Sequence, residues 1–315
     1  MKLHFAPLFA AILTIGLTSQ AFAYSDDDCK PPKTGFSETL CTSDANIFVG
    51  MDKNYQSQAL LNKQGKVIAS LKGFDQVGTW ELSEGLLPVS KNGKIGYLNT
   101  QGKLVVPTVY DSVGDEDNKY DESWANAVSS GRITVKKNGK FGVIDTNNKI
   151  IVPFNKYATI DGFKDGRAVV FSAKSQKYGV IDASGKEVVA PIYDNVYGTL
   201  GGNEGYSEGL LAVQKGKKWG FITKTGKVAI PIVYDEVRPF SEGLAGVLKG
   251  KNWGFVNGAH KVVIPFRYAD DNVQRLGVNY LGATYFVFDK GVAEVSTKNG
   301  EPVCINKSGK TVACR

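Results

Sequence analysis

Histidine and cysteine, which supply most transition-metal ligands in proteins, are scarce in this sequence of 315 residues. There are two histidines, His4 and His260, and four cysteines, none of which lies between residues 42 and 303. No two cysteines have the C-x-x-C spacing of a zinc site. A Ser/His/Asp triad would depend on His260 alone in the mature chain. We therefore expect no metal site, no cofactor and no catalytic residues.

Long apolar runs are also missing, apart from one at the N-terminus. Lys2 precedes the apolar run from Leu8 to Leu17, and Ala21-Phe22-Ala23 has the small-x-small pattern of a cleavage site. We expect residues 1–23 to be a signal peptide that is cut after Ala23, in a protein that is periplasmic or secreted. The run is too short to span a bilayer, so we expect no transmembrane segment. The residue directly after the cut is Tyr24 and not the cysteine of a bacterial lipoprotein.

A strong excess of one charge is the third feature that is missing. The chain has 38 Lys and Arg against 31 Asp and Glu, which gives a formal net charge of +7. This excess is too small and too diffuse to indicate a nucleic-acid-binding protein. We expect no nucleic-acid partner.

What the sequence does contain is a short phrase that recurs. An aromatic residue or Ile is followed by glycine, and a lysine, a proline and a tyrosine come next, with the lysine always seven positions after the glycine. The five clear copies begin at Ile95-Gly96, Phe141-Gly142, Tyr178-Gly179, Trp219-Gly220 and Trp253-Gly254. Weaker copies flank them near residues 60–67 and 290–310. Atypical end copies are expected in stacked repeats, because a terminal unit has solvent on one side.

Each copy has the pattern of a β-hairpin. In the best copy, residues 219–222 and 227–230 are two β-rich runs that flank a turn with a glycine. The constant interval is what a hairpin of fixed register requires. We expect Pro231 to end the pairing, because proline cannot donate to a ladder. About three strands per copy, without helical periodicity, predict an all-β fold that is either a propeller-like toroid or a curved β-solenoid.

This pattern resembles the WG-repeat family, also called KWG repeats. Lys218-Trp219-Gly220-Phe221-Ile222 and Asn252-Trp253-Gly254-Phe255-Val256 carry its signature, and the tail Gly-Lys-x-x-x-Pro-x-x-Tyr-Asp follows at 226–235. The resemblance covers roughly residues 55–315, so we expect an N-terminal segment at 24–54 and then a domain of six to seven repeats. It implies a bacterial β-repeat protein, often exported, and carries over no catalytic residue.

Recurrence indicates that the conspicuous aromatic and glycine residues are structural and do not form a ligand cage. We expect the aromatic side chains to fill the core between repeats, and the glycines to let a neighbouring backbone approach. This applies to the pairs Phe141 and Gly142, Tyr178 and Gly179, Trp219 and Gly220, and Trp253 and Gly254.

Several acidic residues also recur at fixed positions in the repeat, which indicates a structural role for them too. Asp111, Asp194 and Asp235 follow repeat tyrosines, and Glu84, Glu208 and Glu242 precede glycines. We expect these carboxylates to bind nearby backbone amides, in preference to acid–base chemistry. His260 occupies a turn-glycine position and is expected to be an exposed loop residue. The acidic runs 26–28 and 115–118 could bind calcium, but a solvated acidic loop is the favoured interpretation.

The cysteines of an exported chain favour disulfides. Three pairings are possible, and we prefer Cys29–Cys41 with Cys304–Cys314, because the second pair flanks a hairpin turn centred near Gly309. The other pairings would join the N-terminal segment to the C-terminal one.

Two kinds of position are candidate binding sites. Lysines crowd the expected hairpin tips, where they could meet an anionic glycan, a lipid headgroup or an acidic protein, or could simply keep the protein soluble. They are Lys91, Lys94, Lys136, Lys137, Lys140, Lys215, Lys217 and Lys218. The second kind lies where the repeat is interrupted, at 111–130, 197–206 and 269–289, because the scaffold does not need those residues. From these insertions we select Arg275, Tyr280, Tyr285, Tyr197 and Tyr206 as binding residues.

The sequence thus favours an exported, non-enzymatic repeat protein that binds a protein or an anionic glycan at the bacterial envelope. One specific version is an immunity-like protein that masks a toxin. The alternatives are a hydrolase of cell-wall or carbohydrate substrates and a purely structural envelope component.

Overall fold

The computed structural model describes residues 29–114, 124–197, 205–269 and 285–314. These residues form strands β1 to β26 and no helix. The strands make seven antiparallel sheets, which we call blades 1 to 7 in chain order. The prediction of an all-β repeat fold is confirmed.

The strands keep their chain order within every blade. Blade 1 contains β1 (Glu38–Cys41), β2 (Ile47–Met51), β3 (Ser57–Asn62) and β4 (Val67–Ser70), and blade 2 contains β5 (Gln76–Val77), β6 (Leu86–Lys91), β7 (Lys94–Asn99) and β8 (Leu104–Tyr110). Blade 3 contains β9 (Arg132–Lys137), β10 (Lys140–Asp145) and β11 (Ile150–Val152), and blade 4 contains β12 (Thr159–Ile160), β13 (Arg167–Ser172), β14 (Lys177–Asp182) and β15 (Glu187–Tyr193). Blade 5 contains β16 (Asn195–Val196), β17 (Leu210–Lys215), β18 (Lys218–Thr223) and β19 (Val228–Tyr234), and blade 6 contains β20 (Glu236–Val237), β21 (Leu244–Lys249), β22 (Asn252–Asn257) and β23 (Val262–Ala269). Blade 7 contains β24 (Val292–Ser296), β25 (Pro302–Asn306) and β26 (Thr311–Val312).

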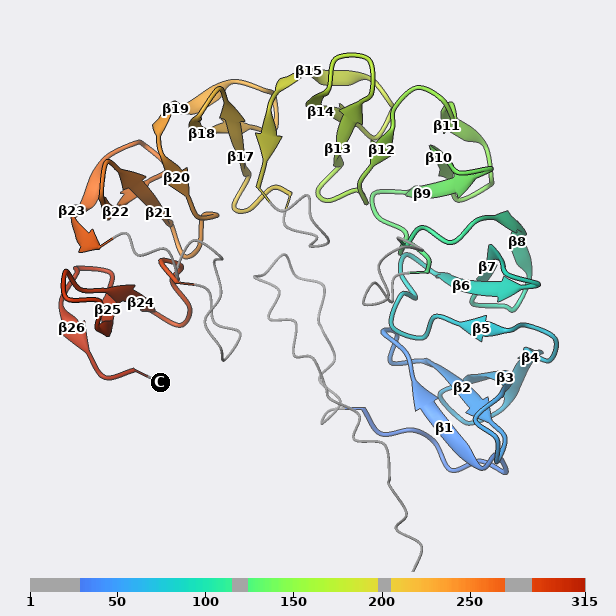
Figure 1. Cartoon of the computed structure of the whole chain (residues 1–315). Coiled ribbons are helices and arrows are strands. Elements are labelled where there is room, and N and C mark those ends of the chain that lie inside the picture. Colours follow the sequence, from blue (N-terminus) through green and yellow to red (C-terminus); the bar gives the residue numbers. More distant parts are fainter. Residues whose placement is uncertain (1–28, 115–123, 198–204, 270–284, 315) are drawn as a thin grey trace, which may run out of the picture.

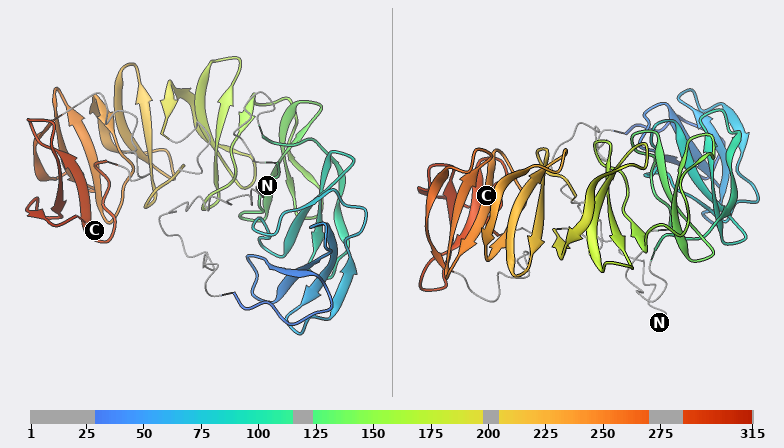
Figure 2. Two further views of the ribbon diagram at one scale, coloured as in Figure 1. Left: turned by 60° about the horizontal axis from the view of Figure 1, so that its bottom comes forward. Right: turned by 90° about the horizontal axis from the view of Figure 1, so that it is seen from above.

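The blades follow one another along an open arc, with blade 1 and blade 7 at its two ends (Figure 1). The last strands of the blades, such as β8, β15, β19 and β23, lie along the convex edge (Figure 1). Apolar clusters between successive blades form the core, as between blades 6 and 7. Figure 2 shows the same arc from two further sides. The arrangement is that of an opened propeller.

Each copy of the repeated phrase is shared between two blades. The copy from Trp219 to the residue before Trp253 covers β18 and β19 of blade 5, then β20 and β21 of blade 6. The chain therefore links every blade covalently to the next, and the interface between blades lies within the repeat.

The glycine of the phrase faces a bulge that contains the proline. Trp219 pairs with Tyr234 and Phe221 with Ile230, so Gly220 alone stands opposite three residues of β19. A Cβ atom on Gly220 would lie 2.6 Å from the carbonyl oxygen of Ile230. The predicted close approach is thus confirmed at Gly220, and it is made by the neighbouring strand of the same blade. At Gly142 the close group is instead the Phe154 ring, 2.7 Å from the added Cβ.

The prediction that Pro231 ends the pairing is wrong. Strand β19 continues through Pro231 to Tyr234, where pairing with Trp219 resumes. Pro231 sits in the bulge, where the ladder is interrupted and its missing N–H is not needed.

The aromatic residues of the phrase pack in the core, as predicted, but to different depths. Trp253 is fully buried, and its ring stacks on Phe286 with centroids 4.5 Å apart. Phe141, Tyr178 and Trp219 are half-buried and pack against the apolar clusters of their blades.

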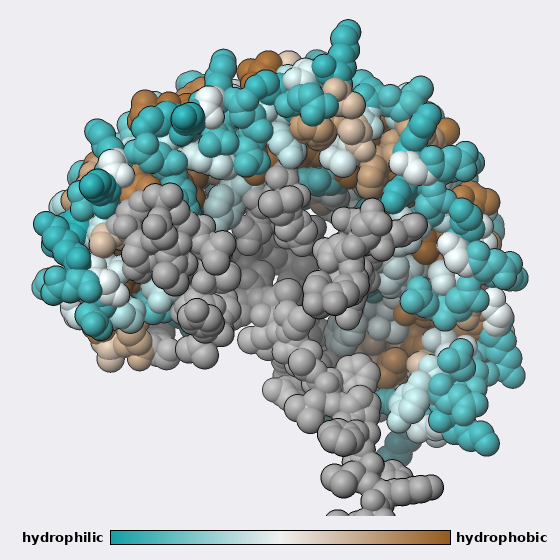
Figure 3. All heavy atoms as spheres, in the orientation of Figure 1, coloured by the Kyte–Doolittle hydropathy of each residue, from teal (hydrophilic) through white to brown (hydrophobic). Residues whose placement is uncertain are grey.

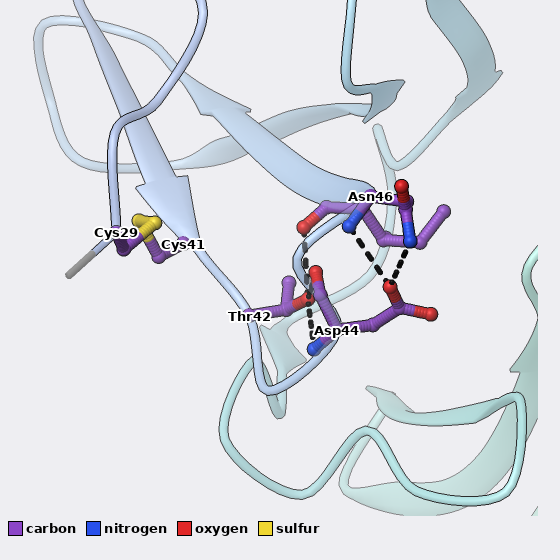
Figure 4. The surroundings of a disulfide bond; sticks show 6 residues. Cys29, Cys41, Thr42, Asp44 and Asn46 are labelled. Atoms are coloured by element: carbon purple, nitrogen blue, oxygen red, sulfur yellow. Dashed lines mark hydrogen bonds between the residues drawn. A yellow bond between two sulfur atoms is a disulfide. The ribbon is translucent and has the colours of Figure 1, made fainter. Parts of the chain in front are cut away.

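Both end blades carry one of the two expected disulfides. Cys29 and Cys41 are bonded with Cα atoms 6.4 Å apart, and Cys304 and Cys314 with Cα atoms 5.2 Å apart. The preferred pairing is confirmed. Figure 4 shows the first disulfide at the end of β1, next to a turn in which the Asp44 carboxylate accepts hydrogen bonds from Asn46.

The chain ahead of β1 covers the outer face of blade 1. Phe36 and the Cys29–Cys41 disulfide pack against Phe48 and Leu61, and a Cβ atom on Gly50 would lie 2.6 Å from the Phe36 ring. The boundary expected at residues 54/55 therefore falls inside blade 1, because β1 and β2 precede it and β3 and β4 follow it.

Candidate binding surface

Lysines gather in the turns that join the two central long strands of blades 2 to 6. We call these the middle turns and define them as residues 91–94, 137–140, 172–177, 215–218 and 249–252. They hold eleven lysines and neither Asp nor Glu: Lys91, Lys94, Lys137, Lys140, Lys174, Lys177, Lys215, Lys217, Lys218, Lys249 and Lys251. Because the strands alternate in direction, all five turns lie on the same face of the arc, which we call the middle-turn face.

The sequence analysis did not single out Lys174, Lys177, Lys249 and Lys251. The signal that could have found them is their place just before the aromatic-Gly step, since Lys177 precedes Tyr178 as Lys218 precedes Trp219. The other lysines were singled out, and Lys136 lies at the edge of the same face with its ammonium 5.8 Å from the centre of the Phe141 ring.

The middle turns have defined backbone geometry. Asn92 and Gly93 have φ of 51° and 68°, and Asn138 and Gly139 have φ of 50° and 71°. Two consecutive positive φ angles in a two-residue Asn-Gly turn are typical of a type I′ hairpin. The lysines at both ends of these turns are therefore displayed from fixed positions.

The aspartates that follow three of the repeat tyrosines connect neighbouring blades on this face. Asp235 accepts a hydrogen bond from the backbone N–H of Gly250 in blade 6 at 2.8 Å, and it pairs with the Lys218 ammonium of blade 5 at 2.5 Å. The Lys218 ammonium and the Gly250 amide hold the pKa of the Asp235 carboxyl below its usual value. Asp235 therefore stays ionised and binds a backbone amide, as the sequence predicts.

The same arrangement recurs along the arc. Asp111 pairs with Lys94 at 2.6 Å and accepts from the Gly139 N–H at 3.0 Å. Asp194 pairs with Lys177 and accepts from the Gly216 N–H at 2.7 Å. Three of the eleven lysines are thus neutralised. The other eight are exposed and form no ion pair within the part of the chain that the structure describes.

On the opposite face, glutamates accept hydrogen bonds from backbone amides of the following blade. Glu84 accepts from the N–H groups of Ser130 and Gly131 at 2.6 and 2.8 Å. Glu208 accepts from Gly243 at 3.1 and 3.0 Å, and Glu242 from Gly291 at 3.1 Å. These are the first turns of the following blades. The repeated carboxylates are therefore held in bonds between blades, as the sequence predicts.

One half-buried carboxyl group has a different environment. Burial raises the pKa of Asp161, which follows β12, to about 6. No partner charge contributes to this shift, so Asp161 is not one of a pair of coupled carboxylates. Within the described ranges, no group of three or more His, Cys, Asp or Glu side chains could hold a metal ion.

Surface hollows are shallow and lie away from Asp161. One is lined by Lys156, Tyr157, Ser175 and Glu187, with the Tyr157 hydroxyl donating to the Glu187 carboxylate at 2.6 Å. Another lies between Asp44 and Glu84, near the first turn of blade 2. Among the described residues, no helix is long and apolar enough to cross a membrane.

Three of the candidate residues from the insertions are described, and these three do not form an exposed surface. Tyr206 is 3% exposed, and its hydroxyl donates to the Thr223 carbonyl at 3.3 Å. Tyr197 and Tyr285 are half-buried and pack against the apolar clusters of blades 5–6 and 6–7. Arg275 and Tyr280, and the acidic runs 26–28 and 115–118, lie outside the described residues. Burial makes Tyr206 a core residue, so we do not retain it as a contact residue.

Aliphatic side chains are exposed along the convex edge. Figure 3 shows apolar patches there among hydrophilic side chains. The last strand of several blades begins with an exposed aliphatic residue, namely Val67, Leu104, Ile150, Val228 and Val262. In β8, β19 and β23 a proline-containing bulge breaks the regular ladder, which reduces the tendency of these edge strands to pair with another chain.

Comparisons with known proteins identify the family. No curated protein matches the chain. Among solved structures, BamB from Moraxella catarrhalis matches 92% of this chain and 85% of its own at 12% identity, with a TM-score of 0.38. Hsv2 from Kluyveromyces lactis matches 88% and 90% at 10% identity, with a TM-score of 0.37. The model of the WG containing repeat matches six successive segments, 60–94, 95–141, 141–171, 178–219, 219–253 and 253–270. The chain belongs to the WG-repeat family.

Proposed function

We propose that this protein is an exported, non-enzymatic scaffold that binds a macromolecule of the bacterial envelope. Its two disulfides fit a protein that folds in an oxidising compartment. Its repeats give a long, rigid surface without a deep pocket among the described residues. Such a surface suits a large partner better than a small substrate.

The observation that carries the proposal is the use of the repeated polar side chains. Asp111, Asp194 and Asp235 on one face, and Glu208 and Glu242 on the other, each bind the backbone of the next blade. A general acid or base needs a carboxyl group that can reach a substrate proton. These carboxylates are engaged in bonds that connect the blades, so we infer that a partner binds to the outer surface of the arc.

The rival function is a hydrolase that acts on cell-wall or carbohydrate substrates. Asp161 is its strongest candidate among the described residues, because its raised pKa suits a general acid. The narrower binding role is the masking of a toxin, which would require a partner protein at fixed stoichiometry.

A capture experiment on envelope fractions distinguishes these functions. The mature protein is immobilised and incubated with a solubilised envelope extract, and the retained protein and carbohydrate are measured. In parallel, soluble products released from peptidoglycan and envelope glycans are followed over time, with the Asp161→Asn variant as control. The scaffold role predicts saturable retention and no release of products.

Product release that continues over many turnovers and disappears in Asp161→Asn would establish the hydrolase and refute the scaffold role. Retention of no envelope material at all would also refute it. A single protein retained at one copy per scaffold would support the narrower masking role.

A further inference from the structure

Over the part of the chain that the structure describes, eight lysines without an ion pair give the middle-turn face an excess of positive charge. They are Lys91, Lys137, Lys140, Lys174, Lys215, Lys217, Lys249 and Lys251, and all of them are exposed. Asp111, Asp194 and Asp235 on this face are already bound to Lys94, Lys177, Lys218 and turn amides. A fourth aspartate, Asp75, is exposed and accepts from the Gly93 N–H at 3.2 Å. Every middle turn from blade 2 to blade 6 therefore presents at least one free ammonium group.

The opposite face shows that lysine alone does not produce this excess. Its turns also contain lysines, but carboxylates lie among them. Lys224 pairs with Asp165 at 2.8 Å, and Lys307 pairs with Glu242 at 3.0 Å. If lysines served only to keep the protein soluble, the two faces would not differ in this way.

The composition of the middle turns restricts the partner. The five ranges contain no aromatic residue and no arginine, and Ala173 is their only apolar residue. Stable protein interfaces are built around aromatic and Arg anchors, and single-stranded nucleic acids are bound by stacking on aromatic rings. Membrane-surface segments add apolar side chains to their basic ones. None of these elements lies within the five middle turns.

The arrangement of the charges indicates an extended ligand. The turns follow one another along the arc (Figure 1). Asp-to-amide bonds fix blade 2 to blade 3, blade 4 to blade 5 and blade 5 to blade 6. A flexible chain with regularly spaced anionic groups can contact several turns at once, and each contact releases counterions. Contacts spread over several modules also strengthen binding through high effective concentration.

We propose that the middle-turn face binds a linear polyanionic glycan, one that carries sulfate, phosphate or carboxylate groups at intervals along its chain. This assignment deepens the proposed scaffold function and rests on it. The lysines of blades 2 to 6 supply the contacts, and the aspartates keep the turns in register for them.

The test uses the mature protein and fluorescein-labelled dextran sulfate, with uncharged dextran of the same length as the neutral probe. One variant carries Lys91→Gln, Lys137→Gln, Lys217→Gln and Lys251→Gln on the middle-turn face. The matched control carries Lys63→Gln, Lys103→Gln, Lys186→Gln and Lys261→Gln, which are exposed lysines of turns on the opposite face. Both variants lose the same charge, so long-range electrostatics are equal in the two.

The middle-turn variant should bind dextran sulfate at least about tenfold more weakly than the parent. The slope of log Kd against log salt concentration should fall by about 3, at roughly 0.7 for each lost contact with a single-stranded polyanion. The control variant should keep the parent slope, and uncharged dextran should not bind.

Equal weakening in the two variants would overturn the proposal, because net charge alone would then explain binding. Tighter binding to vesicles of phosphatidylglycerol and phosphatidylcholine, or to polyglutamate, would replace the glycan by a membrane or an acidic polypeptide. Envelope capture that survives in the middle-turn variant would refute this face and leave the scaffold function standing. Loss of capture by both the parent and the variants would refute the function itself.

Discussion

The Tyr234 hydroxyl lies 2.8 Å from Nε2 of His260, and this hydrogen bond joins blade 5 to the last turn of blade 6. His260 stands where the repeat has glycine and has a φ of 62°. The other position that lacks this glycine is Asn148, with a φ of 66°, and its side chain accepts from the Tyr110 hydroxyl at 2.5 Å. Both departures from the repeat thus form a bond with the tyrosine of the preceding blade. His260 is a loop residue, as expected, but it is half-buried and not exposed.

His260→Ala should destabilise the protein more than His260→Gly. Both substitutions remove the hydrogen bond, but Ala must also adopt a left-handed conformation, which costs about 1–2 kcal/mol, whereas Gly adopts it freely. The free energy of unfolding from urea titration measures the difference. Equal stability of the two variants would contradict the backbone argument.

Tyr234→Phe should cost about 0.5–1.5 kcal/mol in the parent and close to nothing in His260→Gly. A double-mutant cycle gives this coupling directly. Tyr193→Phe is the matched control, because the Tyr193 hydroxyl forms no hydrogen bond within the described part of the chain and the corresponding turn keeps Gly226.

Tyr234 and His260 show which features of the structure can be predicted from the sequence and which cannot. The interval of seven residues between Gly220 and Lys227 was enough to predict the hairpin, because a hairpin of fixed register needs a constant interval. It did not reveal that β19 extends through Pro231, since that depends on the space which Gly220 leaves on the opposite strand. It also did not reveal the partner of His260, which lies in the preceding blade and 26 positions away.

The candidate binding surface can likewise be predicted only in part from the sequence. The lysines before the aromatic-Gly steps can be recognised in the sequence. Which of them are neutralised depends on where the chain crosses from one blade to the next, as at Asp235, which pairs with Lys218. Tyr206, which we selected from an interrupted repeat, ends its insertion inside the core. An insertion must return to the scaffold, and an aromatic residue at its end is readily used for packing.

Gly220→Ala should be among the most damaging single substitutions in the chain. The added Cβ would meet the Ile230 and Pro231 carbonyl oxygens at 2.6 and 2.7 Å, and backbone atoms cannot move aside as a flexible side chain can. We expect a loss of stability of about 3 kcal/mol or more, at the upper end for overpacking. Gly258→Ala is the control, because nothing lies within 4 Å of its added Cβ. A parent-like melting temperature for Gly220→Ala would show that the bulge can open.

Trp253→Ala should destabilise more than Trp219→Ala. Trp253 is fully buried, stacks on Phe286 and has the Arg238 guanidinium 4.6 Å from its ring centre, whereas Trp219 is half-buried. A buried Trp→Ala substitution typically costs about 3–5 kcal/mol, and Trp219→Ala should fall below this range. Urea titration measures the free energy of unfolding of both variants, which can be compared if the two have the same dependence on urea concentration. The reverse order would mean that blades 6 and 7 are less well packed than the ring contacts indicate.

Asp235→Asn should lower stability at neutral pH and lose its effect in acid. The folded-state pKa of Asp235 lies below the unfolded value, so its ionised form stabilises the fold above about pH 4, and this stabilisation is lost as the pH falls through the folded pKa. Because the pair with Lys218 is partly exposed, we expect less than about 1 kcal/mol at pH 7. Urea titrations of parent and variant at neutral and strongly acidic pH test this. A difference that persists in acid would assign the effect to the lost hydrogen-bond geometry and not to charge.

Removal of the N-terminal disulfide should loosen one end of the arc and leave its middle unchanged. In Cys29→Ser/Cys41→Ser the chain that covers Phe48 and Leu61 is no longer tethered, and a disulfide of this loop length contributes about 2–4 kcal/mol. Since blades contact mainly their neighbours, amide hydrogen exchange should accelerate in β1 to β4 and stay at the parent rate in β13 to β18. Cys304→Ser/Cys314→Ser should accelerate amide hydrogen exchange in β24 to β26 and leave the exchange rates of blade 1 at the parent values. Faster exchange throughout the arc in either variant would show instead that the blades unfold as one cooperative unit, in which the terminal covers stabilise every blade to the same extent.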